Sequence, residues 1–128
     1  MKKKFYLCKI CGNLVDLINE GGGTLVCCGE DMELFTVNTV DADYEKHIPV
    51  VEVLKEGTED IMEIKIGSVE HPMIREHYID FLYVEYTDGG TLIKLDDKPY
   101  AKLNVTGKDL VGVYAYCNLH GMWGTSLK

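Results

Sequence analysis

Residues 79–95 read IDFLYVEYTDGGTLIKL and carry the clearest structural signal in this chain. The first eight of them are rich in aromatic and β-branched side chains, which are typical of β-strands. The sequence Asp88-Gly89-Gly90 is a turn signal, and a second apolar run, residues 92–95, follows it. This stretch therefore predicts two strands joined by a turn.

The same pattern recurs on both sides of that stretch. Turn signals return about every ten residues, and no segment has a helical period of useful length. We therefore predict that residues 38–128 form an antiparallel β-sandwich or barrel. Besides residues 79–86 and 92–95, the predicted strands are residues 50–54, 62–66, 101–105 and 110–116, the last of these being the final long strand.

Residues 1–37 are predicted to form a separate small module. They include two cysteine pairs, Cys8-x-x-Cys11 and Cys27-Cys28, each followed by a glycine that favours a tight turn. Residues 5–7 and 25–26 are short strand-like pieces beside these pairs. So short a segment cannot build a sufficient core without a staple, which the cysteines can supply. Residues 36–43 resemble a linker.

The overall charge excludes some classes of function. The chain has 128 residues and a formal net charge of −8, and its pI is about 4.9. No stripe of Lys and Arg is present, and Lys2-Lys3-Lys4 is interpreted as a solvated tail, which argues against nucleic-acid binding. There is no signal peptide and no run of about 18 apolar residues. We therefore expect a soluble cytoplasmic protein without a membrane partner, in which cysteines bind metal rather than form disulfides.

Every cysteine and histidine falls into one of two groups. Four sulfurs near the N-terminus suit a tetrahedral iron or zinc ion, and an adjacent cysteine pair implies a distorted tetrahedron. The spacing leaves open a structural zinc and a redox iron. The second group has four imidazoles and one thiolate, and five donors suit iron better than a four-coordinate structural zinc. Its members are His47, His71, His77, Cys117 and His120.

These motifs resemble the two-iron superoxide reductases called desulfoferrodoxins. The cysteine pairs resemble a rubredoxin- or desulforedoxin-like module. The sequences around the histidines and Cys117-Asn118-x-His120-Gly121 resemble a neelaredoxin-like domain. The resemblance implies a mostly β chain with a small Fe(Cys)4 module, residues 1–37, and an immunoglobulin-like β-sandwich, residues 38–128. It also implies a homodimer.

The resemblance assigns a role to each site residue. The first iron would be bound by Cys8, Cys11, Cys27 and Cys28. The second would have Cys117 as its axial ligand and four equatorial histidines, His47, His71, His77 and His120. The reaction implied is one-electron reduction of superoxide to hydrogen peroxide, with electrons from rubredoxin or a similar donor. Lys46 would attract superoxide to an otherwise acidic protein, and Glu45 would bind the ferric iron.

Neighbouring residues receive smaller roles. Trp123 is expected to pack near the second group without a redox role, and Tyr44 and Tyr116 are interpreted as packing aromatics. Asn118 is expected to hydrogen-bond within its turn. Backbone N–H groups of Asn118 or Leu119 are candidates to donate to the Cys117 sulfur.

Three other functions stay open at this point. The chain could be a zinc-ribbon module fused to a β-sandwich that binds a partner, and a protein without iron or colour would favour this. It could be an iron electron carrier with a closed second site, which would not bind azide or cyanide. A superoxide dismutase would differ in its products, because it also oxidises superoxide.

Overall fold

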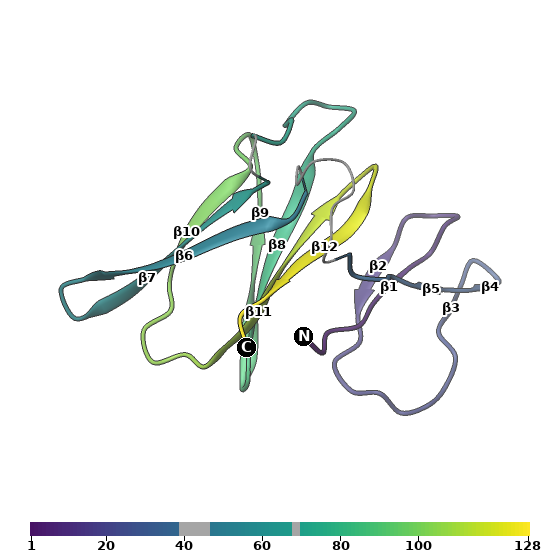
Figure 1. Cartoon of the computed structure of the whole chain (residues 1–128). Coiled ribbons are helices and arrows are strands. Elements are labelled where there is room, and N and C mark those ends of the chain that lie inside the picture. The colour runs from purple at the N-terminus through teal and green to yellow at the C-terminus, as the bar shows by residue number, and fades with distance from the viewer. Residues whose placement is uncertain (39–46, 68–69) are drawn as a thin grey trace. The chain divides into compact units, whose positions relative to one another are not determined.

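The computed structural model describes residues 1–38, 47–67 and 70–128. Twelve β-strands and no helix are found in these residues. They form two compact units, Met1–Thr36 and Val37–Lys128 (Figure 1). None of the described segments is a helix long and apolar enough to cross a membrane.

The N-terminal unit is built from very short strands. One sheet has the order β2-β1-β5, and β3 and β4 form a separate hairpin. The predicted strand at residues 5–7 is confirmed, and the one at 25–26 lies one residue further along. Three strands were not predicted, because two or three residues are too few to show alternation. The strands are β1 (Phe5–Leu7), β2 (Leu14–Asp16), β3 (Val26–Cys27), β4 (Glu30–Asp31) and β5 (Glu33–Leu34).

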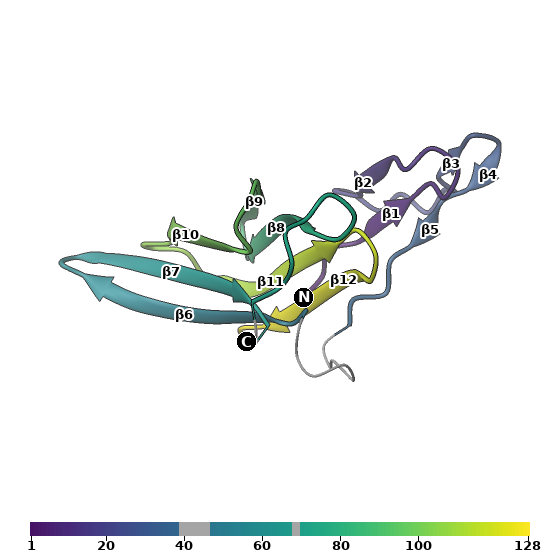
Figure 2. The same cartoon turned by 90° about the horizontal axis from the view of Figure 1, so that it is seen from above.

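The C-terminal unit is a sandwich of two antiparallel sheets. One sheet has the order β10-β7-β6 and the other the order β12-β11-β8-β9. Figure 2 shows the β6–β7 hairpin lying across from the sheet that contains β8 and β11. The strands are β6 (Pro49–Glu56), β7 (Glu59–Ile66), β8 (Ile79–Tyr86), β9 (Gly89–Lys94), β10 (Tyr100–Asn104), β11 (Leu110–Cys117) and β12 (Gly121–Ser126).

This strand order is immunoglobulin-like, as expected. The first, second and fifth strands of the unit form one sheet, and the third, fourth, sixth and seventh form the other, with the third and sixth at its centre. The fourth strand, β9, pairs with the third rather than with the fifth. The core between the sheets contains the fully buried side chains of Met62, Ile64, Leu82, Val84, Val113 and Ala115.

The two predicted strands of the β8–β9 hairpin are confirmed, but β9 begins at Gly89 rather than at residue 92, and the turn is Thr87-Asp88. Strand β8 has the predicted bounds, and β9 pairs with it from Tyr86 opposite Gly89 to Phe81 opposite Lys94. Gly90 has a packing reason to be glycine, because a Cβ atom there would collide with the Tyr83 ring. Gly89, the first residue of β9, has a positive φ of 150°, which glycine adopts more readily than other residues.

The prediction that residues 110–116 form the last strand was wrong. Strand β12 follows β11 and pairs with it from Cys117 opposite Gly121 to Gly112 opposite Ser126. Its two glycines hide the strand signal, because glycine has low strand propensity. On its other side, Asn38 forms a parallel bridge with Trp123. Residue 38 of the expected linker thus belongs to the sandwich, and residues 39–43 lie outside the described part.

Candidate metal centres

The first candidate centre brings four cysteine sulfurs together. They belong to Cys8, Cys11, Cys27 and Cys28, and all lie within 4.8 Å of one another. Cys8 follows β1 and opens a tight turn, in which Gly12 N–H donates to the Cys8 carbonyl at 2.9 Å. The sulfurs of Cys11 and Cys27 are 3.6 Å apart. Both predicted cysteine pairs therefore face one point.

The adjacent pair is explained by a two-residue hairpin turn between β3 and β4. Cys27 is the last residue of β3, and Cys28 and Gly29 form the turn with positive φ angles of 53° and 76°. This is the signature of a type I′ turn, whose first position favours Asn. A left-handed conformation costs a residue with a Cβ atom about 1–2 kcal/mol. Cys28 therefore holds a strained position, as functional residues often do.

The sulfurs perturb one another electrostatically. Hydrogen bonding from the Cys11 backbone N–H is the main cause that lowers the pKa of Cys8 to about 7. The neighbouring sulfurs, that of Cys11 first, raise the pKa of Cys28 to about 12. A bound cation would offset this repulsion and allow all four sulfurs to be thiolates, and a metal ion with thiolate preference fits.

Asn13 also belongs to this cluster, and sequence reasoning missed it. Its backbone N–H donates to the Cys11 sulfur at 3.4 Å, and its side-chain amide donates to the Cys27 sulfur at 3.6 Å. Hydrogen bonds to thiolate ligands tune the potential of a bound iron. The only signal in the sequence is its position two residues after Cys11.

The second candidate centre lies at one end of the sandwich. His47 lies just before β6, separated from its first residue, Pro49, by Ile48. His71 and His77 lie in the connection from β7 to β8. Cys117 ends β11, and His120 lies in the turn to β12. Because neighbouring strands in this unit are antiparallel, the end of one strand and the start of the next lie at the same end of the sandwich. The fold thus gathers residues that are up to 73 positions apart.

The distances confirm that the five side chains converge. Donor atoms of His47, His77, Cys117 and His120 all lie within 4.8 Å of one another. The His47 Nε2 and His120 Nδ1 atoms are 2.9 Å apart. His71 completes the group, with its Nε2 atom 3.6 Å from the Cys117 sulfur.

Two imidazoles show that a metal ion fits this cluster. His71 Nδ1–H donates to the Pro72 carbonyl at 2.7 Å, which leaves the Nε2 lone pair directed at the cluster. His77 Nε2 is buried and has no hydrogen-bond partner among the described residues. A buried polar atom without a partner is costly, and a metal ligand bond would satisfy it.

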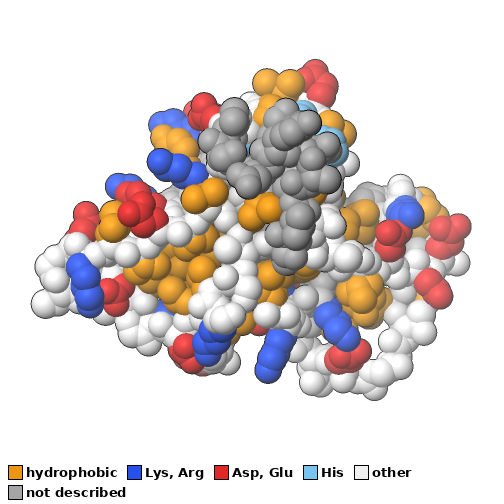
Figure 3. Space-filling model, in the orientation of Figure 1, with side chains coloured by type: hydrophobic (Ala, Val, Ile, Leu, Met, Phe, Trp, Pro, Cys, Tyr) orange, Lys and Arg blue, Asp and Glu red, His pale blue; other side chains and the backbone are white. Residues whose placement is uncertain are grey.

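Burial is graded across the cluster. Cys117 is fully buried, and His71 and His47 are 2% and 4% exposed, whereas His120 is exposed. Histidine side chains are visible at the surface near the top of Figure 3. Burial lowers the pKa of His71 to about 4 and also lowers the pKa of His77. Both imidazoles are therefore neutral at pH 7, which is the form that binds metal.

The low pKa of His71 predicts acid sensitivity of the metal-free protein. An unfolded histidine titrates near 6.5, so below that pH the unfolded state binds a proton that the folded state excludes down to pH 4. The free energy of unfolding should therefore have its full value above pH 6.5 and fall by up to about 3 kcal/mol as the pH drops to 4. Urea unfolding of metal-free protein across this range measures it.

A His71→Leu variant provides the comparison for this prediction. Its carboxylates titrate as in the parent, but it lacks the buried imidazole. Its stability should fall less steeply between pH 6.5 and 4. Identical pH profiles of the parent and the variant would contradict the role of His71.

Two neighbouring residues hold the cluster in place. Trp123 packs at the site as expected, stacked on His47 with ring centroids 4.8 Å apart, and its indole N–H donates to the His120 carbonyl. Asn118 was expected to hydrogen-bond within its turn, but its hydrogen bonds among the described residues are made to Tyr78 and Glu76. Its backbone N–H donates to the Tyr78 carbonyl at 3.1 Å rather than to the Cys117 sulfur.

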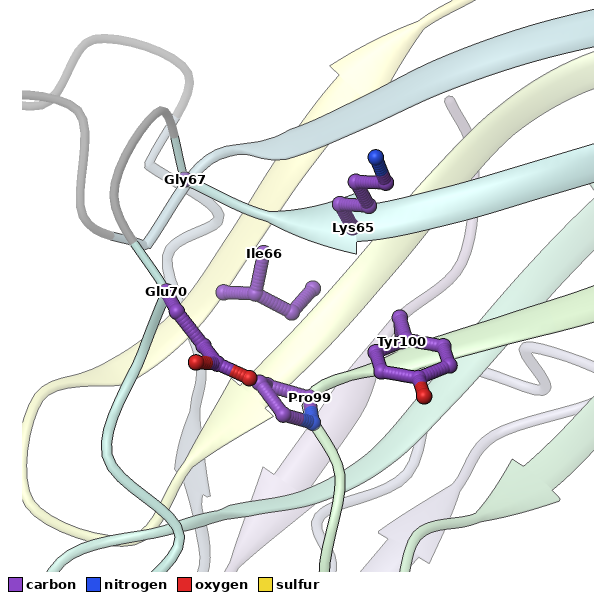
Figure 4. A pocket seen from close by; sticks show the side chains of 6 residues that line it. All are labelled: Lys65, Ile66, Gly67, Glu70, Pro99 and Tyr100. Atoms are coloured by element: carbon purple, nitrogen blue, oxygen red, sulfur yellow. The ribbon is translucent and has the colours of Figure 1, made fainter.

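Three other predicted residues lie outside the described part of the chain. Glu45 and Lys46, and also Tyr44, belong to residues 39–46, which the structure does not describe. A separate hollow of about 310 Å³ contains no cysteine or histidine (Figure 4). It is lined by Lys65, Ile66, Gly67, Glu70, Pro99 and Tyr100.

Together the fold and the two clusters define a two-centre metalloprotein, with a cysteine-clasped module and an immunoglobulin-like domain. The family model described as "Desulfoferrodoxin" matches residues 39–126, and "Desulfoferrodoxin, N-terminal domain" matches residues 1–35. The chain belongs to the desulfoferrodoxin family. The two clusters are consistent with two iron centres, one at the four cysteines and one at the histidines and Cys117.

Individual relatives are similar over most of the chain. A desulfoferrodoxin homolog from Archaeoglobus fulgidus is 43% identical over 122 residues, which is 92% of each chain. A superoxide reductase from Pyrococcus abyssi is 35% identical and covers 69% of this chain and 90% of its own. The crystal structure of the superoxide reductase from Treponema pallidum matches 98% of both chains, with 32% identity and a TM-score of 0.80.

Proposed function

We propose that this protein is a superoxide reductase that converts superoxide to hydrogen peroxide at the histidine–cysteine centre. The observation that carries the proposal is the convergence of four imidazoles and one buried cysteine sulfur, including His77 Nε2, which has no hydrogen-bond partner among the described residues. Similarity to proteins named superoxide reductase supports it.

The proposal assigns ligands and domains. Residues 1–37 form the Fe(Cys)4 module and residues 38–128 the reductase domain. The first iron is held by Cys8, Cys11, Cys27 and Cys28. The second iron would be held by His47, His71, His77, His120 and Cys117. When bound, the second iron supplies the single electron that, with two protons, turns superoxide into hydrogen peroxide.

The protein controls charge and water around this centre. As a metal ligand, the Cys117 sulfur would place a negative charge in a fully buried position, which would favour the more oxidised metal. His120 and Leu119 are exposed, so solvent water reaches this part of the cluster and can deliver the protons. In this proposal rapid protonation from solvent favours release of peroxide over cleavage of its O–O bond.

We expect Lys46→Ala to slow the reaction of the reduced protein with superoxide. The net charge of −8 repels the anion, and Lys46, next to His47, provides local attraction. The second-order rate constant should fall about tenfold at low ionic strength, and the difference should shrink as salt screens the charges. Stopped-flow or pulse-radiolysis rates across a salt series measure this.

Lys55→Ala is the matched control, because it changes the net charge equally. Lys55 lies at the end of β6 and pairs with Asp60 at 2.9 Å. It should slow the reaction much less than Lys46→Ala. Equal rates for Lys46→Ala and the parent at low salt would remove Lys46 from the mechanism.

Glu45→Ala should change the absorption spectrum of the oxidised protein. A carboxylate is a hard oxygen ligand that suits ferric iron, so its loss should shift the thiolate-to-iron absorption band. Glu52→Ala, at an exposed position of β6, should leave the band unchanged. If both variants have the parent spectrum, Glu45 is not a ligand of the ferric site.

The proposal also includes the partners and the location of the protein. We propose that a rubredoxin-like protein donates the electrons, that the protein is a homodimer and that it is located in the cytoplasm. The family resemblance supports these points. The exposed Cys11 and Cys28 offer a solvent-facing edge of the first centre to such a donor. Co-purification, sedimentation and reduction by rubredoxin under anaerobic conditions test these points separately.

Metal analysis and anion binding separate this function from two alternatives. Two irons per chain, and an azide-induced change in the spectrum of the second, are expected. Zinc in both centres would favour a zinc-ribbon and β-sandwich binding protein. Iron that does not respond to azide would favour an electron carrier with a closed second site.

A further inference from the structure

The pairing of β8 with β11 is interrupted just where the second cluster begins. Tyr116 pairs with Phe81, but Cys117 pairs with Ile79, so the register shifts between these two positions. Such a bulge leaves backbone groups beyond it without their regular ladder partners. The next residue, Asn118, provides the partners instead.

Asn118 binds the backbone on both sides of His77. Its side-chain oxygen accepts a hydrogen bond from Tyr78 N–H at 2.7 Å, and its amide nitrogen donates to the Glu76 carbonyl at 3.0 Å. Its own backbone N–H donates to the Tyr78 carbonyl at 3.1 Å. The side-chain amide thus provides the donor and the acceptor that the backbone of a neighbouring strand would otherwise provide.

The backbone of His77 is fixed from the other side as well. Its N–H donates to the Ile74 carbonyl at 3.1 Å and its carbonyl accepts from Ile74 N–H at 3.0 Å. These bonds close the loop, but they do not connect it to β11. The contacts of Asn118 make that connection, because Asn118 directly follows Cys117.

We propose that Asn118 is a positioning residue that sets the His77 imidazole relative to the Cys117 sulfur. This proposal rests on the metal site proposed above. It requires the amide, since an acceptor faces Tyr78 N–H and a donor faces the Glu76 carbonyl. Leucine is similar in size to asparagine but has no hydrogen-bond donor or acceptor. Alanine lacks both the size and the hydrogen-bonding groups. Without the amide, His77 keeps its loop but loses its fixed distance from Cys117.

Cobalt(II) titration of the metal-free full-length protein tests this role. Cobalt absorption reports the affinity and the coordination geometry of each centre, and the four-cysteine centre serves as an internal reference. Asn118→Ala and Asn118→Leu should weaken binding at the second centre by about 10- to 100-fold and shift its cobalt spectrum. The reference centre should not change.

Asn104→Ala is the matched control. Asn104 also uses both ends of its amide, donating to Glu59 and accepting from Thr106, in a turn that carries no proposed ligand. It should lower the melting temperature without changing cobalt affinity or spectrum. Loss of stability alone is thereby separated from loss of positioning.

Wild-type affinity and an unchanged cobalt spectrum in both Asn118 variants would overturn the positioning role while leaving the metal site intact. Absence of cobalt binding at the second centre of the parent protein would overturn the proposed metal site itself. If Asn118→Ala does not fold, Asn118→Asp keeps the acceptor for Tyr78 N–H. A shifted cobalt spectrum in that variant supports the proposal, and an unchanged one overturns it.

Discussion

Cys117→Ser should lower the rate constant of the reduced protein with superoxide by about 100-fold or more. Loss of residues that only support a ligand costs 10- to 100-fold, so loss of the ligand itself should cost at least as much. A serine hydroxyl does not ionise at pH 7 and cannot replace the thiolate charge. It can still face His71 Nε2 and His120 Nδ1, which lie 3.6 and 3.7 Å from the sulfur, so the fold should persist.

The measurement combines metal content, absorption and rate. The second centre should lose its thiolate absorption band while the four-cysteine band remains. Ala115→Ser is the control, because it also places a hydroxyl on the buried face of β11 without touching the cluster. A superoxide rate in Cys117→Ser equal to that of Ala115→Ser would refute the ligand role of Cys117.

Cys28→Asn should empty the first centre and unfold the N-terminal unit. Strands of two or three residues bury little, and metal binding supplies about 10–16 kcal/mol in small structural zinc modules. Asn is favoured at this position of a type I′ turn, so the substitution should relieve strain rather than add it. Any loss of order can therefore be assigned to the missing metal.

Hydrogen exchange read by mass spectrometry locates the effect. Residues 1–36 should exchange rapidly in Cys28→Asn, and the sandwich should stay protected by its own core. Glu30→Asn, in the same hairpin with all four thiols present, should behave as the parent. Full protection of residues 1–36 without metal would contradict the idea of a metal staple.

The same variant also distinguishes two roles of the first centre. If the first iron relays electrons, Cys28→Asn should react normally with superoxide once but turn over slowly with an external donor. If the first iron is only a staple, both rates should match the parent. Either result leaves the chemistry at the second centre unchanged.

Much of the sandwich was predictable because its central strands are rich in apolar, aromatic and β-branched residues. Residues 79–86 were predicted to the residue, since all of them except Asp80 and Glu85 favour a strand. Strand β12 was not, because Gly121 and Gly124 dilute its signal and its order comes from pairing with β11. The shortest strands of the N-terminal unit depend on tertiary context in the same way.

The candidate ligands were predictable from residue type, but their supports were not. Cysteines and histidines stand out because each is chemically distinctive and none is left over. Asn13 and Asn118 act through hydrogen bonds whose partners depend on a tight turn and on a bulge. The left-handed backbone of Cys28 likewise appears only when both turn residues are placed.

The central claim is that this protein reduces superoxide and does not dismutate it. The direct test mixes anaerobically reduced protein with a known amount of superoxide and measures peroxide, oxygen and iron oxidation together. We predict peroxide equal to the superoxide consumed, one oxidised second-centre iron for each superoxide, and no oxygen. Half as much peroxide together with released oxygen would mean dismutation, and no reaction would contradict the account of the second centre.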